Sequence, residues 1–470
     1  MARRKLMLMG LDCAPPAIIF DRMKGDLPNL EAMMGTGLYG PLRSTIPPIT
    51  IPAWLVMMSG RSPGRLGLYG FRHRTKFSYD DMWIANSTRM HAPTVWDLLG
   101  DEGMRSVIIG VPPSYPPKEM NGVSVGCFIT PTTEGEYTYP PEAKAEVERV
   151  SGGYITDIEF RTEDRDKLLR ELYEMTDRRA KVVRHYAEKG DWDFMMFVEI
   201  GLDRINHAFW KFYDTQHHLY EPGNRYEDAI PDYYRHLDGI VGELLEILDD
   251  DTLLLATSDH GAKGMRGALC INQWLEEEGL LKFKSKPEGI SKFEQCEVDW
   301  ENTTAWGWGG YYARIFVNVE GREPKGIVPQ SDYERVRDDL IARIEAIPDM
   351  DGRPLDTFVL KPEQVYKVTN GDYPDLMVFL DDLYWRAAGT VGHPDKYLRE
   401  NDTGPDDAVH DWNGIIIYKD PKRPAGRPLV GAKLIDVAPT ILKLMGASVP
   451  PDLDGSPIQP IIDLSNEVSE

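Results

Sequence analysis

The chain carries short, continuous apolar runs in place of a strict alternation of hydrophobic and polar residues. Continuous hydrophobicity of this kind predicts strands that are buried on both faces, as in a mostly parallel sheet. Most of these runs end at polar residues, glycines or prolines, which predicts loops at the ends of the strands. The runs lie at 6–11, 107–111, 194–200, 253–256, 376–380 and 415–418.

Helical patterns lie between these runs. The longest spans 165–189, where Leu168, Leu172 and Val183 recur among polar residues. Strand-like runs that alternate with helices predict an α/β fold with a doubly wound, mostly parallel sheet flanked by helices. Further helices are predicted at 94–99, 333–347 and 435–445, the last despite Pro439.

Two segments interrupt the alternation of strands and helices. Residues 128–165 are rich in Thr, Pro, Glu and Tyr, and residues 283–350 are rich in aromatic residues and glycines. We interpret both as cap segments inserted over the sheet, within a single domain that spans 1–470. Four aromatic residues of the second segment either form its core or stack on a substrate. They are Trp306, Trp308, Tyr311 and Tyr312.

The composition is that of an ordinary globular protein, with 42% hydrophobic and 27% charged residues. Lys and Arg total 53 against 76 Asp and Glu, which gives a formal net charge of −23. Such an acidic chain repels nucleic acid duplexes and anionic membranes, so we expect neither as a partner. A phosphate substrate remains compatible with this charge, because bound metal cations invert the local sign.

The cysteines and the start of the chain bear on the compartment. Cys13, Cys127, Cys270 and Cys296 form no CxxC pair, which predicts reduced thiols and neither a disulfide framework nor a cysteine zinc site. The apolar run after the basic start is too short for a signal peptide, and Asp12 interrupts it. We therefore expect a soluble, cytoplasmic protein without a membrane-spanning helix.

Aspartates and histidines follow three of the predicted strands. Asp12 follows the first strand, Asp203 follows the third, and Asp259-His260 follows the fourth. In open α/β sheets, ligands bind at the carboxyl ends of the strands. These residues are therefore candidate metal ligands, although a capping aspartate or a polar turn would explain each of them separately.

The spacing of Asp203 and His207 adds to this signal. Residues four apart lie on one face of a helix, where an Asp and a His can chelate a single cation. An ordinary helix salt bridge is the alternative interpretation. Gly261 directly after Asp259-His260 permits a sharp turn, which would allow both side chains to reach one metal.

Thr50 and His410 complete the set of candidates. Thr50 lies in the proline-flanked segment 47–52, which stiffens the chain and can hold a hydroxyl group at the start of a helix. The alternative is a helix cap without chemistry. His410 precedes the last apolar run, and its alternative is a surface loop histidine. His393 competes with it as a late metal ligand, and we favour His410.

The order of these residues is more specific than any one of them. An Asp, a Thr in a proline-flanked turn, Asp-x-x-x-His, Asp-His-Gly and a late His resemble the alkaline phosphatase superfamily. The chain is most similar to the type I phosphodiesterase/nucleotide pyrophosphatase family, and to its prokaryotic members. The segments 59–63, 67–71, 94–99, 321–324 and 436–440 support this similarity, which covers nearly the whole chain.

The resemblance implies an alkaline phosphatase-like fold with two divalent metal ions. One ion would be held by Asp203, His207 and His410. The other would be held by Asp12, Asp259 and His260, with Thr50 beside it as the catalytic nucleophile. Mixed histidine and carboxylate ligands suit zinc, which is the expected ion, with manganese as the alternative.

The implied activity is metal-dependent hydrolysis of a phosphate ester, of the phosphodiesterase or nucleotide pyrophosphatase type. Thr50 would attack the phosphorus to form a covalent phosphothreonine, which water would then release. The expected partner is a small-molecule phosphate ester, and the sequence is also compatible with an oligomer.

One departure from the family leaves the substrate class open. Phosphodiesterase members often carry an Asn shortly after the nucleophile, and Phe71 occupies that place. A phosphomonoesterase, a phosphomutase or a phosphonate hydrolase on the same metal core is therefore an alternative. A non-catalytic, metal-bound binding protein is an alternative of another class. Another residue would then have to donate hydrogen bonds to the phosphoryl oxygens in place of the Asn. Five residues are candidates by their position, although we favour an ordinary role as surface charge for each: Arg43, Arg72, His73, Arg74 and Lys263.

Overall fold

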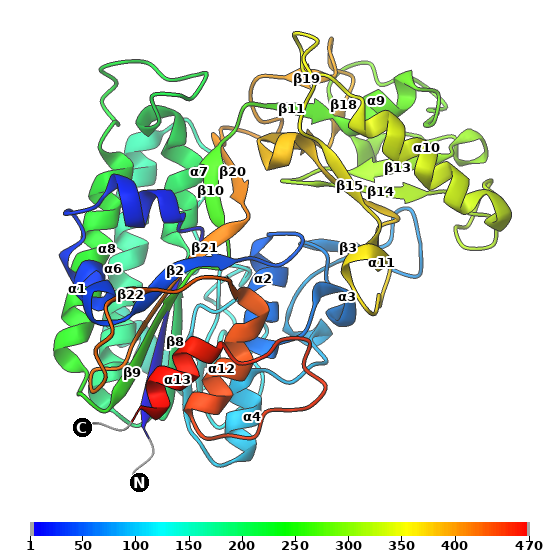
Figure 1. Ribbon diagram of the computed structural model, residues 1–470. Helices are drawn as coiled ribbons and strands as arrows, with labels where there is room; N and C mark the ends of the chain where they lie inside the picture. Colours follow the sequence, from blue (N-terminus) through cyan, green and yellow to red (C-terminus); the bar gives the residue numbers. More distant parts are fainter. Residues whose placement is uncertain (1–3, 468–470) are drawn as a thin grey trace.

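The computed structural model describes residues 4–467 and contains a central sheet between two layers of helices (Figure 1). Residues 1–3, at the basic start of the chain, lie outside the described residues. The strands of the central sheet run in the order β22 (Arg427–Pro428), β2 (Leu38–Arg43), β21 (Asn413–Lys419), β9 (Thr252–Thr257), β1 (Lys5–Leu11), β8 (Phe194–Glu199), β5 (Ser106–Ile109), β6 (Gly122–Val125) and β7 (Thr138–Tyr139), and β23 (Ala432–Lys433) also pairs with β2.

The middle of this sheet is parallel. Strands β9, β1, β8, β5 and β6 pair in parallel, and β21 and β7 pair antiparallel to their neighbours. The predicted α/β class and mostly parallel sheet are therefore confirmed. Five of the six predicted runs are strands of this sheet, and the run at 376–380 is not.

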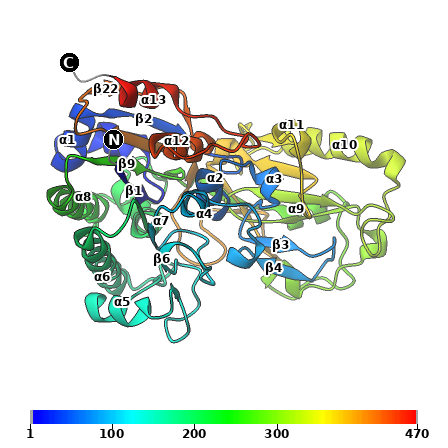
Figure 2. The same cartoon turned by 90° about the horizontal axis from the view of Figure 1, so that it is seen from below.

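The central strands are buried on both faces because successive residues enter different cores. In β1, Met7 and Met9 enter one core, whereas Leu6 and Leu8 enter the other. Figure 2 shows the helices on the two sides of the sheet. The first core lies under α1 (Pro28–Thr36), α5 (Ala143–Ser151), α6 (Arg165–Lys189), α7 (Gly201–Tyr213) and α8 (Ala229–Ile247). The second lies under α2 (Thr50–Ser59), α4 (Val95–Asp101), α12 (Val437–Leu444) and α13 (Gln459–Asn466).

The predicted helices are present with small shifts at their ends. Helix α6 has the predicted bounds, since the Asp164 side chain accepts from the Lys167 N–H at its start and Gly190 ends it with φ 65°. The helix predicted at 435–445 begins as a 3₁₀ turn, η7 (Leu434–Asp436), and continues as α12. Pro439 lies in the first turn of α12, where a missing N–H breaks no helix hydrogen bond.

The part of the chain between strands β10 (Gly261–Gly264) and β20 (Ala408–Asp411) forms a smaller lobe, and these two strands pair with each other (Figure 1). Because these strands pair with each other, the chain leaves and re-enters the main lobe at the same place. One sheet of the smaller lobe contains β13 (Ala305–Trp308), β14 (Ala313–Val317), β16 (Leu376–Phe379) and β15 (Phe358–Leu360). Another contains β17 (Trp385–Ala388), β11 (Gly267–Cys270) and β19 (Tyr397–Leu398), and the helices are α9 (Ile271–Glu277) and α10 (Tyr333–Glu345).

The run at 376–380 is thus a strand of the smaller, antiparallel sheet. Its continuous apolar pattern has the same cause as in the central sheet, because β16 is covered on both faces. Leu376 and Val378 enter one core, and Met377 and Phe379 enter another. Hydrophobic pattern alone cannot distinguish two sheets whose strands are buried in the same way.

The two segments that the sequence predicts to be cap insertions lie in different parts of the structure. Residues 283–350 lie within the smaller lobe. Part of 128–165 joins the central sheet as β7, and α5 packs against α6. The remaining short elements are α3 (Pro63–Leu66), α11 (Pro362–Val365), β3 (Arg72–Arg74), β4 (Met82–Ile84), β12 (Ser291–Lys292) and β18 (Thr390–Val391).

The four cysteines are unpaired, as predicted. Within residues 4–467, every helix is too short or too polar to traverse a lipid bilayer.

A buried ion pair joins the end of β8 to α6. The Glu199 carboxylate lies 2.9 Å from Nη1 of Arg179, and both side chains are almost fully buried. The same carboxylate accepts a hydrogen bond of 2.8 Å from the N–H of Gly201, the first residue of α7. Glu199 therefore fixes the direction in which α7 leaves the sheet.

We expect Arg179→Met to destabilise the protein by about 3–5 kcal/mol, because it leaves the Glu199 charge buried without a partner. Urea unfolding followed by tryptophan fluorescence would measure the loss. Arg178→Met is the matched control, since the Arg178–Glu174 pair is partly exposed and is worth about 0.5 kcal/mol. Equal losses in the two variants would show that the buried pair does not have this role.

Candidate metal centre and active-site cavity

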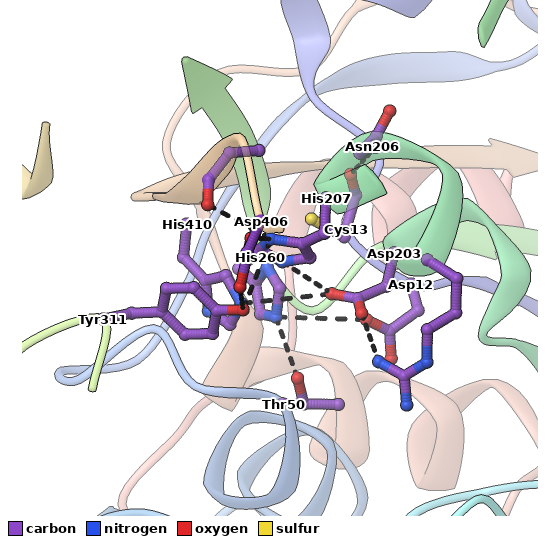
Figure 3. A network of polar contacts seen from close by, with 12 residues as sticks. Asp12, Cys13, Thr50, Asp203, Asn206, His207, His260, Tyr311, Asp406 and His410 are labelled. Atoms are coloured by element: carbon purple, nitrogen blue, oxygen red, sulfur yellow. Dashed lines mark hydrogen bonds and ion pairs between the residues drawn. The ribbon is translucent and has the colours of Figure 1, made fainter. Parts of the chain in front are cut away.

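Three adjacent strands deliver the candidate ligands to one place. Strand β1 lies between β8 and β9, so the carboxyl ends of all three meet at the same edge of the sheet. Asp12 directly follows β1, Asp203 lies in the first turn of the helix after β8, and Asp259 closely follows β9. Figure 3 shows Asp12 and Asp203 facing the same cluster of histidines.

Asp12 is held from the opposite side by Trp54 on α2. The indole N–H of Trp54 donates a hydrogen bond of 2.6 Å to Oδ2 of Asp12. Gly10 makes this approach feasible, because a Cβ at position 10 would lie 2.6 Å from Cη2 of Trp54. Asp12 is fully buried, and its Oδ1 atom has no hydrogen-bond partner.

Helix α7 presents Asp203 and His207 on one buried face. Nε2 of His207 lies 3.2 Å from Oδ1 of Asp203, as the spacing of four predicts. The other carboxylate oxygen, Oδ2, accepts a hydrogen bond of 2.5 Å from Arg204. Arg204 also forms two hydrogen bonds with Asp157, at 2.9 and 2.8 Å. Asp203 thus has one oxygen held by the protein and one directed toward the histidines.

Asp259 and His260 lie together where β9 ends. Nε2 of His260 lies 3.1 Å from Oδ2 of Asp259 and 3.9 Å from Oδ1 of Asp12. His410 reaches the same place because β20 pairs with β10, with His410 opposite Ala262. Its ring stacks on His260 with centroids 3.7 Å apart, and its Nε2 lies 3.9 Å from Oδ1 of Asp203.

Thr50 is the first residue of α2 and is 4% exposed. Its hydroxyl oxygen lies 3.2 Å from Nε2 of His260, so it faces the cluster directly (Figure 3). The proline-flanked segment therefore holds Thr50 at the start of a helix, as predicted. All seven candidate residues come together in the structure: Asp12, Thr50, Asp203, His207, Asp259, His260 and His410.

The three histidines share one orientation. In each ring, Nδ1 faces a backbone carbonyl, which can only accept a hydrogen bond, so Nδ1 carries the proton. These carbonyls are Gly261 for His260 at 3.1 Å, Pro48 for His410 at 2.7 Å and Ala408 for His207 at 3.1 Å. Each Nε2 lone pair is then free to bind a cation, which is the usual arrangement of histidine ligands.

The cluster concentrates negative charge in a buried place. Burial raises the pKa of Asp12 well above its usual range, and the neighbouring Asp203 raises it further. Burial and the Asp12 charge raise the pKa of Asp259 in the same way. Burial would also raise the pKa of Asp203, but His207 and Arg204 lower it below its usual value. Such a site favours bound cations.

Among the described residues, three sets of ligand atoms lie within 4.8 Å of one another. One is Asp12, Asp259 and His260; the second is Asp203, His260 and His410; the third is Cys13, Asp203 and His207. The first set is one of the two ligand trios implied by the resemblance. The second and third share Asp203, and both histidines of the other implied trio approach its Oδ1 atom.

The cluster opens into a cavity of about 560 Å³. Thr50, Asp203 and His410 line it from the main lobe, and Trp308 and Tyr311 line it from the smaller lobe. Phe71 also lines the cavity and packs edge-on against Phe128. A cavity of this size holds a small organic molecule, with its polar groups at the aspartate and histidine end.

Two further residues, Asp406 and Tyr311, contact the ligand histidines in a way that the sequence does not predict. Asp406 accepts from Nδ1 of His207 at 2.8 Å and is fixed in turn by Arg161 and Arg386. Tyr311 stacks on His410 at 4.0 Å and donates to Asp406 at 3.0 Å. Their only sequence signals are proximity to His410 and an aromatic cluster, and neither is specific.

Most of the other candidate ligands and donors named from the sequence lie away from the cluster. His393 bonds Thr390 at 2.7 Å and belongs to none of the three ligand sets. Of the five donors suggested by position, Arg72 lines the cavity. Lys263 pairs with Asp382 and Asp411, and Arg74 is buried against Glu323.

The family described as type I phosphodiesterase/nucleotide pyrophosphatase matches residues 6–406. A search of the curated proteins finds no match. Human ectonucleotide pyrophosphatase/phosphodiesterase 5 is 13% identical with a TM-score of 0.59, covering 99% of this chain and 100% of that chain. The inactive threonine-to-alanine variant of the murine protein, in complex with AMP, is 13% identical with a TM-score of 0.59, covering 98% and 99%.

The solved structures share the fold over their whole length, at an identity too low to carry more than the fold. The family match spans most of the chain and includes six of the seven clustered residues. The chain therefore belongs to the type I phosphodiesterase/nucleotide pyrophosphatase family of the alkaline phosphatase superfamily, whose members are hydrolases that act on phosphate esters.

Proposed function

We propose that this protein hydrolyses phosphodiesters, with Thr50 as the nucleophile and two divalent metal ions at the cluster described above. The observation that carries the proposal is the convergence of the Thr50 hydroxyl with three aspartates and three histidines at the wall of one cavity. The family is one of metal-dependent phosphoric ester hydrolases, which agrees with this chemistry. Zinc is the ion we propose, since both nitrogen and oxygen ligands are present.

The residues present fit two cations. Four buried atoms that face one another have no hydrogen-bond partner within residues 4–467: Asp12 Oδ1, Asp203 Oδ1, His207 Nε2 and Asp259 Oδ2. Unsatisfied buried polar atoms are rare in folded proteins, and several in one place indicate a bound ion. We propose that Asp203, His207 and His410 hold one ion and that Asp12, Asp259 and His260 hold the other. Bound divalent cations lower the pKa of a hydroxyl group and neutralise the charge of a phosphoryl group.

The chain's own residues supply the remaining parts of the reaction. The Thr50 oxygen attacks the phosphorus, the bond to one ester oxygen breaks, and that alcohol leaves. The adduct is a phosphothreonine that still carries the second substituent, and one water molecule then releases it as a phosphate monoester. Thr50 begins helix α2, so the unpaired N–H groups of the first turn favour a phosphoryl oxygen nearby. Arg204 is a second donor beside Asp203.

A diester suits the cavity better than a monoester. Its aromatic walls, which include Phe71 and Trp308, provide apolar contact for an organic substituent on the phosphorus. The murine relative forms a complex with AMP, in which the phosphate is esterified to a ribose that carries an aromatic base. By analogy, we propose a substrate with at least one ring-containing substituent.

We expect Thr50→Ala to lower kcat for bis(4-nitrophenyl) phosphate roughly 10³-fold or more, because the covalent step is lost. Mass spectrometry of acid-quenched reactions is expected to detect the covalent adduct at position 50 in the wild type and not in the alanine variant. Thr50→Ser is the matched control and retains a hydroxyl group for the adduct. Substantial turnover by the alanine variant, with metal still bound, would contradict the nucleophile assignment.

Each ligand trio is expected to account for one ion. Protein loaded with zinc and desalted should contain about two ions per chain, and Asp203→Asn and Asp259→Asn should each contain about one. Mass spectrometry of the metal content would measure this. Asp250→Asn, an exposed aspartate remote in the fold from the cluster, is the control. Unchanged zinc content in both ligand variants would exclude the two-site arrangement.

Asp406 is expected to act as a positioning residue for His207. Asp406→Asn keeps the shape but removes the negative charge, so His207 becomes a weaker ligand and zinc affinity should fall about 10–100-fold. Competition with a fluorescent chelator would measure the affinity. Asp407→Asn is the matched control, since that carboxylate faces Lys211 and Arg165. A loss of thermal stability in metal-free protein without a change in zinc affinity would indicate a purely structural role.

A further inference from the structure

One arginine in the cavity wall lacks a counter-charge. Arg314 lies on β14, is 8% exposed and lines the cavity with Thr50. Its Nη1 atom donates a hydrogen bond of 2.6 Å to the backbone carbonyl of Arg72, and its guanidinium lies 5.0 Å from the centre of the Trp308 ring. Within residues 4–467, Arg314 forms no ion pair with a carboxylate.

Each of the other arginines of the cavity wall has a carboxylate partner. Arg161 and Arg386 pair with Asp406 at 2.8 and 3.1 Å, and Arg204 pairs with Asp157 at 2.8 Å. Arg72, which is largely exposed, lies 3.5 Å from Glu294. The wall also contains Lys292, an exposed side chain that water can solvate. Among the described arginines of the wall, Arg314 therefore differs in being buried without a carboxylate partner.

The position of Arg314 follows from the pairing of two strands. In the β13–β14 pair, Arg314 stands opposite Trp308, and cross-strand partners lie on the same face of a sheet. Both residues line the cavity. Gly70 lies beside the guanidinium, since a Cβ at position 70 would be 3.5 Å from Cζ of Arg314. The absence of a side chain at Gly70 leaves this side of the guanidinium open.

Leaving such a charge unpaired is unfavourable. Removing a guanidinium from water has a large free-energy cost unless an anion is nearby. Burial, together with the positive charges of Arg72 and Arg74, lowers the pKa of Arg314, while Tyr312 opposes this effect. The neighbouring buried strand residues on this face offer no counter-charge, because they are apolar: Trp306, Trp308, Phe316 and Met377. An anionic ligand group would supply the missing charge.

We propose that Arg314 forms a subsite for a second anionic group of the substrate, separate from the phosphoryl group that reacts at Thr50. This inference rests on the proposed function. The substrate class is a phosphodiester in which one substituent carries its own oxyanion, a carboxylate or a phosphate. The planar guanidinium binds either group through paired hydrogen bonds, with Trp308 beside it for the apolar part of the substituent.

The test uses three 4-nitrophenyl phosphodiesters that differ in the second substituent. The substituent is phenyl, 4-carboxyphenyl or 4-(phosphonomethyl)phenyl, so the two charged esters distinguish a carboxylate from a phosphate-like group. For the wild type, we expect a higher kcat/KM for at least one charged ester than for the phenyl ester. In Arg314→Met, the ratio of charged to phenyl kcat/KM should fall roughly tenfold or more. Arg314→Lys should restore part of this ratio.

A second variant tests the charge without removing the arginine. Gly70→Asp places a carboxylate against the guanidinium, so it should compete with the anionic substituent and lower the same ratio. Gly70→Ala, which adds the Cβ without the charge, is its matched control. This pair keeps the test valid if Arg314→Met fails to fold.

A binding measurement separates the two levels of the proposal. The three esters are titrated into zinc-loaded Thr50→Ala protein, with tryptophan fluorescence as the signal. If the wild type hydrolyses none of the esters, the proposed function fails. The anionic subsite is still supported in that case if Thr50→Ala protein binds a charged ester more tightly than the phenyl ester and the added Gly70→Asp substitution abolishes this preference. If the wild type shows no preference for a charged ester in binding or turnover, the Arg314 subsite is excluded, whatever the hydrolytic activity.

Discussion

The central constraint in this structure is the burial of three carboxylates at one edge of a parallel sheet. Asp12, Asp203 and Asp259 meet there because β1 lies between β8 and β9, and burial alone would leave their mutual repulsion uncompensated. The surrounding residues either share this charge or fix its position. Trp54, Arg204 and the N–H of Cys13 each take one carboxylate oxygen. The other three oxygens face the Nε2 atoms of the histidines. Bound cations would compensate this concentration of carboxylates.

The sequence predicts those residues of the site that directly follow a strand or share one helix. Asp12 and Asp259 follow buried strands closely, so the hydrophobic pattern by itself places them at the sheet edge. The i, i+4 spacing of Asp203 and His207 is likewise a local property of one helix. The family context favours His410, and the structure brings it in by a different route, the pairing of β20 with β10.

The residues that escape prediction depend on contacts between distant segments. Asp406 matters because it reaches His207, which lies 199 positions earlier, and Tyr311 because it stacks on His410 from the other lobe. No local pattern specifies such contacts. The same limit explains why the run at 376–380 predicts a strand but not its sheet, since a strand covered on both faces has one hydrophobic pattern in either lobe.

The two lobes contribute different residues to the cavity. All seven clustered residues belong to the main lobe or to the two strands that join the lobes, whereas Trp308 and Arg314 come from the smaller lobe. The smaller lobe has its own hydrophobic core, so its cavity-lining residues can change without altering the strands that position the ligands. Tyr311 is the exception, because it belongs to the smaller lobe and yet contacts both His410 and Asp406. Tyr311 therefore ties the position of the smaller lobe to His410 directly and to His207 through Asp406.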